Sequence, residues 1–91
     1  MESVEKIKER LKKGGYTLIS EYNDAANEFF PDHDHPGDEL LVVVSGEIGV
    51  TMDGKKYSLK PGDELFFPAK LTHNATIGNE GCFYIVGEKG P

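Results

Sequence analysis

The sequence predicts an all-β protein, a small antiparallel β-barrel or jelly roll, with one short N-terminal helix. Three observations support this fold class. The chain has 91 residues, which is the size of a single domain. Apolar residues recur at helical spacing near the N-terminus, and after residue 15 short apolar segments alternate with turns, as in sandwiches and barrels. We therefore expect residues 1–15 to form a helix packed on the barrel, and residues 16–91 to form one barrel domain.

The N-terminal segment has the pattern of a short amphipathic helix. Val4, Ile7 and Leu11 fall on one face at helical spacing. Acidic residues lie near its start and lysines near its end, the order that the helix dipole favours, and Gly14–Gly15 supplies the stop. The acidic residues also interrupt the basic patch, so packing onto the barrel is favoured over contact with an anionic surface.

The first strands follow from alternation and from one continuous apolar run. Residues 16–22 alternate between two faces, and a polar loop is expected at residues 23–28 before an extended segment opens at Phe29. Residues 40–44 are continuously apolar, as expected of a strand that is buried on both faces. Ser45–Gly46 is interpreted as a turn that separates this strand from the next.

The remaining strands are separated by turn signals. Residues 48–52 alternate, and Asp53–Gly54 predicts a two-residue hairpin that returns along residues 55–59. Pro61–Gly62 presets the dihedral angles of the following turn. The last three strands are expected at residues 65–67, 71–77 and 82–86.

Composition and charge exclude several classes of partner. The chain carries 10 Lys and Arg against 16 Asp and Glu, a net charge of −6, which argues against nucleic acid and anionic membranes as partners. No apolar run reaches the length of a membrane span, and no signal peptide is recognisable. The single cysteine, Cys82, cannot form an internal disulfide and is interpreted as a small buried apolar residue rather than a reactive thiol. These features favour a cytoplasmic location.

Three histidines and one glutamate have the spacing of a metal site. Residues two apart in a strand point to the same side, so His33 and His35 can aim at one point. Glu39 shares that side if the chain stays extended, and His73 would join from a later strand. Three neutral imidazoles and one carboxylate suit a single divalent transition metal, Mn, Fe, Co, Ni, Cu or Zn. A purely structural pairing of the histidines fits less well with their spacing to Glu39.

The same alternation predicts which apolar residues line a pocket beside the metal. Leu41 and Val43 follow Glu39 inward, and Ala75 and Ile77 share the face of His73. The acidic residues Asp32, Asp34 and Asp38 are interpreted as a solvated face, with a hydrogen bond from one of them to a ligand imidazole as an alternative.

Two sequence motifs resemble those of the cupin superfamily. The first is His33-x-His35-x-x-x-Glu39 followed after six residues by Gly46, and the second is Gly62, five residues, Pro68 and then His73. The chain is therefore similar to the small single-domain cupins, the monocupins or type-2 cupins. This resemblance implies a double-stranded β-helix, carries His33, His35, Glu39 and His73 over as the metal ligands, and implies a homodimer built on the strand around residues 16–22.

Three residues depart from these motifs. Asn27 and Lys70 stand where the motifs usually have Gly, and Ile77 replaces the Asn that closes the second motif. Asn tolerates glycine-like dihedral angles, whereas a Lys turn is more strained. Ile77 makes the pocket more apolar, but none of the three changes removes a ligand.

Two functions remain open from the sequence. The first is a divalent-metal-dependent enzyme, dioxygenase-, decarboxylase- or isomerase-like, that acts on a small organic molecule at open positions of an octahedral metal; an oxidoreductase of the dioxygenase type is one form of it. The alternative is a non-catalytic module that binds or senses a small molecule or a metal, and a closed tetrahedral zinc would favour such a role. No catalytic residue beyond the metal ligands can be assigned.

Overall fold

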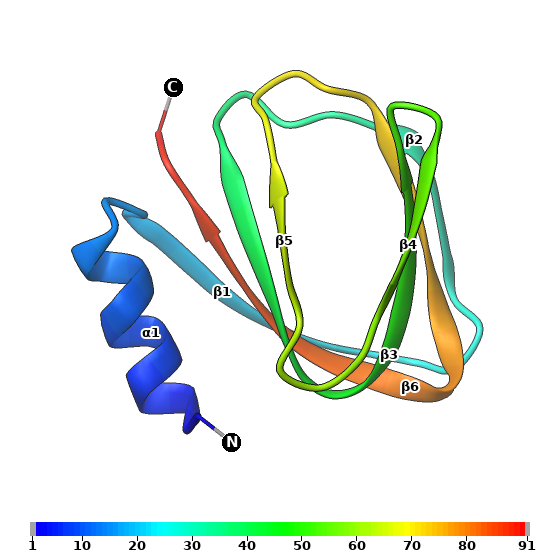
Figure 1. The fold of residues 1–91 in the computed structure, drawn as a ribbon, viewed down its shortest axis with the longest axis horizontal. Coiled ribbons are helices and arrows are strands. Elements are labelled where there is room, and N and C mark those ends of the chain that lie inside the picture. The colour runs from blue at the N-terminus through cyan, green and yellow to red at the C-terminus, as the bar shows by residue number, and fades with distance from the viewer. Residues whose placement is uncertain (1, 91) are drawn as a thin grey trace.

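The computed structural model describes residues 2–90, in which one helix is followed by an antiparallel sheet (Figure 1). Its elements are α1 (Val4–Lys13), β1 (Leu18–Asp24), β2 (Phe29–His33), β3 (Glu39–Met52), β4 (Lys55–Leu59), β5 (Glu64–Phe67) and β6 (His73–Glu88). The all-β class with one short N-terminal helix is therefore confirmed. No helix in the described range has the length and apolarity that a membrane crossing requires.

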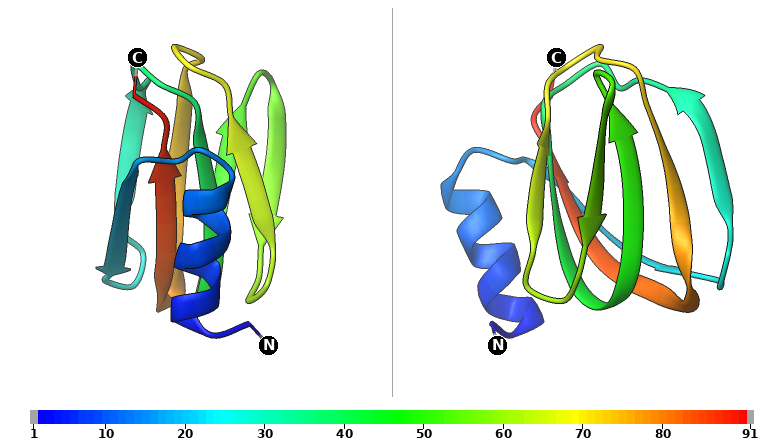
Figure 2. Two further views of the ribbon diagram at one scale, coloured as in Figure 1. Left: turned by 90° about the vertical axis from the view of Figure 1, so that its left-hand side faces the viewer. Right: turned by 45° about the vertical axis from the view of Figure 1, so that its right-hand side comes forward.

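Two long strands, β3 and β6, run through both layers of the fold. In one layer residues 39–43 of β3 pair with residues 84–88 of β6, flanked by β5 and β1. In the other layer residues 48–52 of β3 pair with the start of β6, flanked by β4 and β2. The strand order β1-β6-β3-β4 leaves the sheet unclosed, so the molecule is a jelly-roll-like double layer rather than a closed barrel (Figures 1 and 2).

The bends between the layers are bulges and not turns. The register between β3 and β6 shifts between Val43 and Ser45 and again between Gly46 and Ile48, yet the strands stay paired on both sides. Gly46 has a φ of 77°, and a Cβ there would lie 2.0 Å from the carbonyl oxygen of Gly81. The sequence predicts a turn at Ser45–Gly46 and two separate strands at residues 71–77 and 82–86, and both predictions are wrong. They fail because a bulge, like a turn, places Gly after an apolar run, so the sequence pattern does not distinguish the two.

The bulges also change which residues point inward. Before its bend β6 buries His73, Ala75 and Ile77, and after it Cys82, Tyr84 and Val86 face the same interior. The inward positions thus change from odd to even numbers along one strand. Both halves of β6 therefore face the same interior, although strict alternation along an unbent strand would turn one of them outward.

The core has two parts, one on each side of the first layer. The larger part fills the space between the layers and includes Val43, Ile48 and Ile77, all at most 2% exposed. In the smaller part Ile7 and Leu11 of α1 pack on Val42 and Ile85. Burial of each such side chain stabilises the fold by about 1.5–3 kcal/mol, so α1 is an integral cover of the first layer (Figure 2).

The helix ends as the sequence suggests, but the first strand starts later than expected. Ser3 accepts the N–H of Lys6, and Gly14 follows the last helical residue. The N–H of Tyr16 still donates to the carbonyl of Leu11, so Tyr16 belongs to the helix end and β1 begins at Leu18. The shift carries β1 forward to Asp24, a residue expected to lie in a loop.

Candidate metal centre and its pocket

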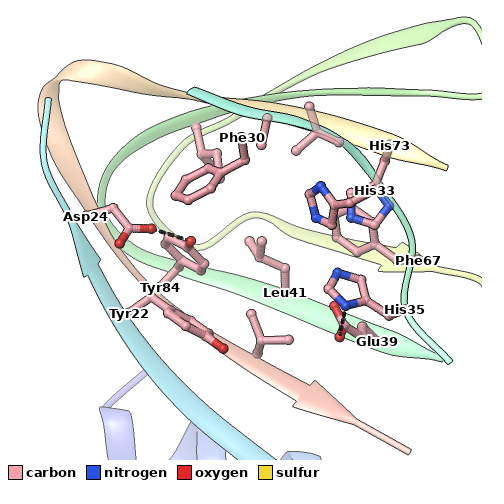
Figure 3. A pocket seen from close by; sticks show the side chains of 14 residues that line it. Tyr22, Asp24, Phe30, His33, His35, Glu39, Leu41, Phe67, His73 and Tyr84 are labelled. Atoms are coloured by element: carbon pink, nitrogen blue, oxygen red, sulfur yellow. Dashed lines mark hydrogen bonds and ion pairs between the residues drawn. The ribbon is translucent and has the colours of Figure 1, made fainter. Parts of the chain in front are cut away.

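The three histidines converge at one end of the space between the layers. His33 ends β2, His73 begins β6 directly opposite it in register, and His35 follows two residues after β2. One ring nitrogen from each lies within 4.8 Å of the others. The ring centroids of His33 and His73 are 4.4 Å apart, and that of His35 lies 5.0 Å from His33 and 5.2 Å from His73 (Figure 3).

Hydrogen bonds to backbone carbonyls fix the orientation of two of the three rings, those of His33 and His73. The Nδ1 atom of His33 lies 2.7 Å from the Pro31 carbonyl oxygen, and Nδ1 of His73 lies 3.1 Å from that of Leu71. A carbonyl oxygen only accepts, so we assign the proton to Nδ1 in both rings. In each case Nε2 keeps a free lone pair, the arrangement that metal-binding histidines adopt in proteins.

Glu39 reaches the histidine group through His35. Its Oε2 lies 3.2 Å from Nδ1 of His35, and the side chain is buried at the start of β3 (Figure 3). The group whose nitrogens converge consists of His33, His35 and His73, and Glu39 stands beside it. Burial, and secondly the carboxylate of Glu88 across the β3–β6 pair, raise the pKa of Glu39 to about 7. A nearby cation would favour its ionised form.

Burial also keeps two of the histidines in the form that a metal needs. Desolvation is the main cause that lowers the pKa of His35 and of His73. A lowered pKa favours the neutral imidazole near pH 7, and only the neutral ring binds a cation. The Phe67 ring packs 4.5 Å from His73 and limits its motion. Three converging imidazoles with a carboxylate alongside fit a divalent transition metal, so the structure positions three histidines to hold one.

Hydrogen bonds from backbone N–H groups hold the segment that carries His35. Asp38 accepts the N–H of Ala69 through Oδ1 at 2.8 Å, and its carbonyl accepts the N–H of Lys89 at 2.9 Å. Lys70 donates its N–H to the His35 carbonyl at 2.8 Å. Gly37 leaves no room for a side chain, since a Cβ would lie 1.8 Å from the Lys89 carbonyl oxygen. Asp38 thus holds the segment next to His35 in place, and both of its hydrogen bonds come from backbone N–H groups rather than from an imidazole.

Asp32 also has a side-chain partner that is not an imidazole. Asp32 accepts a hydrogen bond from the side chain of Asn74 at 3.0 Å. Asp32 and Asp34 are exposed, and Asp38 is half-buried. The interpretation as a largely solvated face is therefore consistent with two of the three residues, and Asp38 differs because it links the loop to the turn at residues 68–70.

A cavity of about 350 Å³ opens beside the histidines. Leu41 and Ala75 line it, as the alternation predicts. Val43 and Ile77 are 0% and 1% exposed and lie in the core, outside the cavity lining. Both lie next to the bends, where the two layers join, so other core side chains cover them. Strand alternation predicts that both side chains face inward, but it does not predict whether an inward side chain reaches the cavity or is covered by the core.

The far side of the cavity carries polar residues that sequence reasoning missed. The hydroxyl of Tyr84 donates to Oδ2 of Asp24 at 2.5 Å, and the Tyr22 ring stacks on Tyr84 with centroids 5.3 Å apart (Figure 3). Asp24 continues the alternation of residue 22, a signal obscured by the expected loop at residues 23–28. Cys82, opposite Asp24 in register, is buried, and burial raises the pKa of its thiol to about 11, which keeps it protonated.

Comparison with known proteins finds one matching family model and several similar solved structures, which together cover most of the chain. Residues 20–86 match the family model described as Cupin domain. A cupin superfamily protein from Desulfitobacterium hafniense is 26% identical with a TM-score of 0.71, over 79% of this chain and 66% of that one. A conserved protein of unknown function from Streptococcus pyogenes is 24% identical with a TM-score of 0.69, over 80% and 64% respectively.

A third solved structure, KdgF from Halomonas sp., is 21% identical with a TM-score of 0.69, and the match covers 80% of this chain and 69% of that one. The chain therefore spans just under two thirds of the length of the D. hafniense and S. pyogenes proteins. None of the curated proteins matches the sequence significantly.

Proposed function

The chain belongs to the Cupin domain family, and on this premise we propose that it is a divalent-metal-dependent enzyme that acts on a small organic molecule. Reactions of the dioxygenase, decarboxylase or isomerase type are the candidates, an oxidoreductase of the dioxygenase type among them. The single observation that carries the proposal is the convergence of His33, His35 and His73 at the wall of a cavity large enough for a small ligand.

The proposed roles follow from the contacts of each side chain. His33, His35 and His73 would hold the metal through Nε2, and Glu39 would supply a fourth, oxygen ligand or the acceptor that orients His35. A bound Mn, Fe, Co, Ni, Cu or Zn ion would act as a Lewis acid or an O₂-activating centre toward the ligand. Leu41 and Val50 line the cavity and would exclude water from the ligand.

Metal analysis tests this proposal directly. Protein purified without added metal is expected to carry nearly one transition-metal ion per chain, and His73→Ala is expected to lose most of it. Glu47→Gln serves as the control because Glu47 is exposed and pairs only weakly, at 3.7 Å, with Lys60. Metal-free protein that takes up none of Mn, Fe, Co, Ni, Cu and Zn in titrations would refute a metal function.

One observation favours the alternative of a non-catalytic binding or sensing module. Among the described residues that line the cavity, Asp24 is the one carboxylate away from the histidine group, and it is engaged by the Tyr84 hydroxyl. The lining thus offers no further free carboxylate as a general base. Ligand-dependent changes at the metal without any turnover of the ligand would favour this module over the enzyme.

We also propose a homodimer formed through β1 and a cytoplasmic location. β1 pairs with β6 alone among the described strands, and its Leu18 side chain is 57% exposed. A free edge with an exposed apolar side chain invites pairing with a second chain. Light scattering is expected to give twice the chain mass of 10.0 kDa, and a 10.0 kDa species would exclude the dimer.

The proposed cytoplasmic location is supported by the lone buried Cys82, which is compatible with a reducing compartment.

A further inference from the structure

We propose that Asp24 and Tyr84 form a second polar subsite, across the cavity from the histidines, which binds a hydroxyl or ammonium group of the ligand. The inference deepens the proposed function, because the other end of the same ligand would meet the metal. Figure 3 shows the two residues on the opposite side of the cavity from His33 and His73.

The fold places this pair on the inner face of the first layer. Tyr84 lies opposite Tyr22 in the pairing of β1 with β6, and Asp24 follows Tyr22 by two residues. Residues two apart share a face, so Tyr22 and Asp24 both point into the cavity, and all three residues line it. The stacked Tyr22 ring restrains the phenol ring of Tyr84, which is only 7% exposed.

The hydrogen-bond capacity of the pair determines what it can bind. Tyr84 has one hydroxyl hydrogen, and it donates that hydrogen to Oδ2 of Asp24. What remains on both side chains is lone pairs, with a negative charge on the carboxylate. Burial, together with the hydrogen bond to Asp24, raises the pKa of Tyr84 well above its usual value, so the hydroxyl keeps its hydrogen.

An acceptor-only, negatively charged subsite selects hydrogen-bond donors. A hydroxyl or ammonium group would donate to the free lone pairs of Asp24 and Tyr84, whereas a carboxylate or phosphate would be repelled. Phe30 and Leu41 also line the cavity. The geometry therefore fits a small molecule with a metal-binding oxygen group at one end, a short apolar body, and a hydroxyl or amine at the other end.

A matched series of small carboxylic acids tests the subsite. Unbranched acids of increasing chain length are used in four forms: unsubstituted, ω-hydroxy, ω-amino and dicarboxylic. Binding to the Co²⁺-loaded protein is followed by the visible spectrum of the ion. At the best chain length the ω-hydroxy or ω-amino acid is expected to bind about ten-fold more tightly than the unsubstituted acid, as one charge-assisted hydrogen bond provides. The comparison of the two substituted forms identifies the donor.

Two variants and one control test whether the preference comes from the Asp24 carboxylate. Asp24→Asn keeps the shape but removes the charge, and is expected to abolish most of the preference for the ω-amino acid. Tyr84→Phe leaves the Asp24 carboxylate in place and is expected to retain that preference. Glu47→Gln makes the same chemical change on the surface and is expected to alter nothing.

A parallel measurement separates this inference from the proposed function. Alkylamines, alkanols and alkanoates are titrated into metal-free protein, and amide shifts in NMR spectra are followed for residues 22–24 and 82–86. Amine- or alcohol-specific shifts there with no Co²⁺ binding would refute the metal function only. Normal Co²⁺ binding with equal affinity for all four acid forms, tighter binding of the dicarboxylic acids, or no binding of any acid would overturn the subsite.

Discussion

Lys70 donates its backbone N–H to the carbonyl oxygen of His35 at 2.8 Å while holding a φ of 65°. A positive φ costs a residue with a Cβ about 1–2 kcal/mol. The turn that supports one histidine of the candidate metal site therefore contains local strain. Asn27 has the same φ, and Asn visits this region more readily than Lys. At both positions the family motifs usually have Gly and this chain does not.

Lys70→Gly is expected to stabilise the protein. Glycine relieves the positive φ, and this gain of about 1–2 kcal/mol is partly offset by the larger entropy of glycine in the unfolded chain. The expected net gain is about 0.5–1 kcal/mol in urea unfolding. Asn27→Gly is the control and is expected to change the stability less. A Lys70→Gly variant less stable than the wild type would show that the lysine side chain contributes more than the strain costs.

Asp38→Ala is expected to weaken metal binding although Asp38 is not itself one of the ligands. The change removes the acceptor for the Ala69 N–H and loosens the segment that carries His35. The expected loss is about ten-fold in metal affinity, with a loss of about 1–2 kcal/mol in stability. Asp38→Asn keeps an oxygen acceptor and is expected to restore affinity. Equal metal affinity in wild type and Asp38→Ala, measured by competition with a chelator, would contradict this role.

Glu39→Gln is expected to stabilise the metal-free protein and to weaken metal binding. The folded pKa of Glu39 is raised from 4.5 to about 7, so its contribution to stability is complete below pH 4.5 and is lost as the pH rises toward about 7. The neutral amide avoids this loss. Relative to wild type, the variant should gain on the order of 1–3 kcal/mol between pH 4.5 and about pH 8. Urea unfolding at both pH values measures the gain. A difference in stability between variant and wild type that does not change with pH would contradict a buried carboxyl group with a raised pKa.

Metal affinity is expected to fall in two stages as the pH decreases. Glu39 takes up a proton first, below about pH 7, and the imidazoles of His35 and His73 follow below their usual value of 6.5 because burial lowers their pKa. In Glu39→Gln only the second stage should remain. Isothermal titration with Zn²⁺ across this range tests both stages, and an affinity that stays constant down to about pH 5 would exclude imidazole ligands.

Gly46→Ala is expected to be far more destabilising than Gly54→Ala. Both glycines have a positive φ, 77° and 75°, but a Cβ at Gly54 meets open space whereas one at Gly46 lies 2.0 Å from the Gly81 carbonyl oxygen. The control should cost about 1–2 kcal/mol from the dihedral angle alone. The larger cost at Gly46 should show as loss of folded protein or a much lower unfolding midpoint. Similar costs at both positions would mean that the bulge can relax.

Much of this structure could be predicted from residue patterns, and what could not has identifiable physical causes. The alternation of residues 48–52 and the Asp53–Gly54 turn predicted the β3–β4 hairpin, and the spacing of His33 and His35 predicted their convergence. The bulge at Gly46 has the local chemistry of a turn, so the pattern predicts two strands where the structure has one. The position of Asp24 in the cavity depends on where β1 ends, which side-chain patterns fix only to within a few residues.

The change of inward positions along β6 also limits how such a site can change over evolution. His73 and Tyr84 belong to one strand and face one interior only because the bulge between them shifts the alternation. A single-residue insertion or deletion in that stretch would rotate one of them toward solvent and break the cavity in one step. Ligand length should therefore diversify by side-chain replacement on the walls, while the spacing between these two positions stays constant.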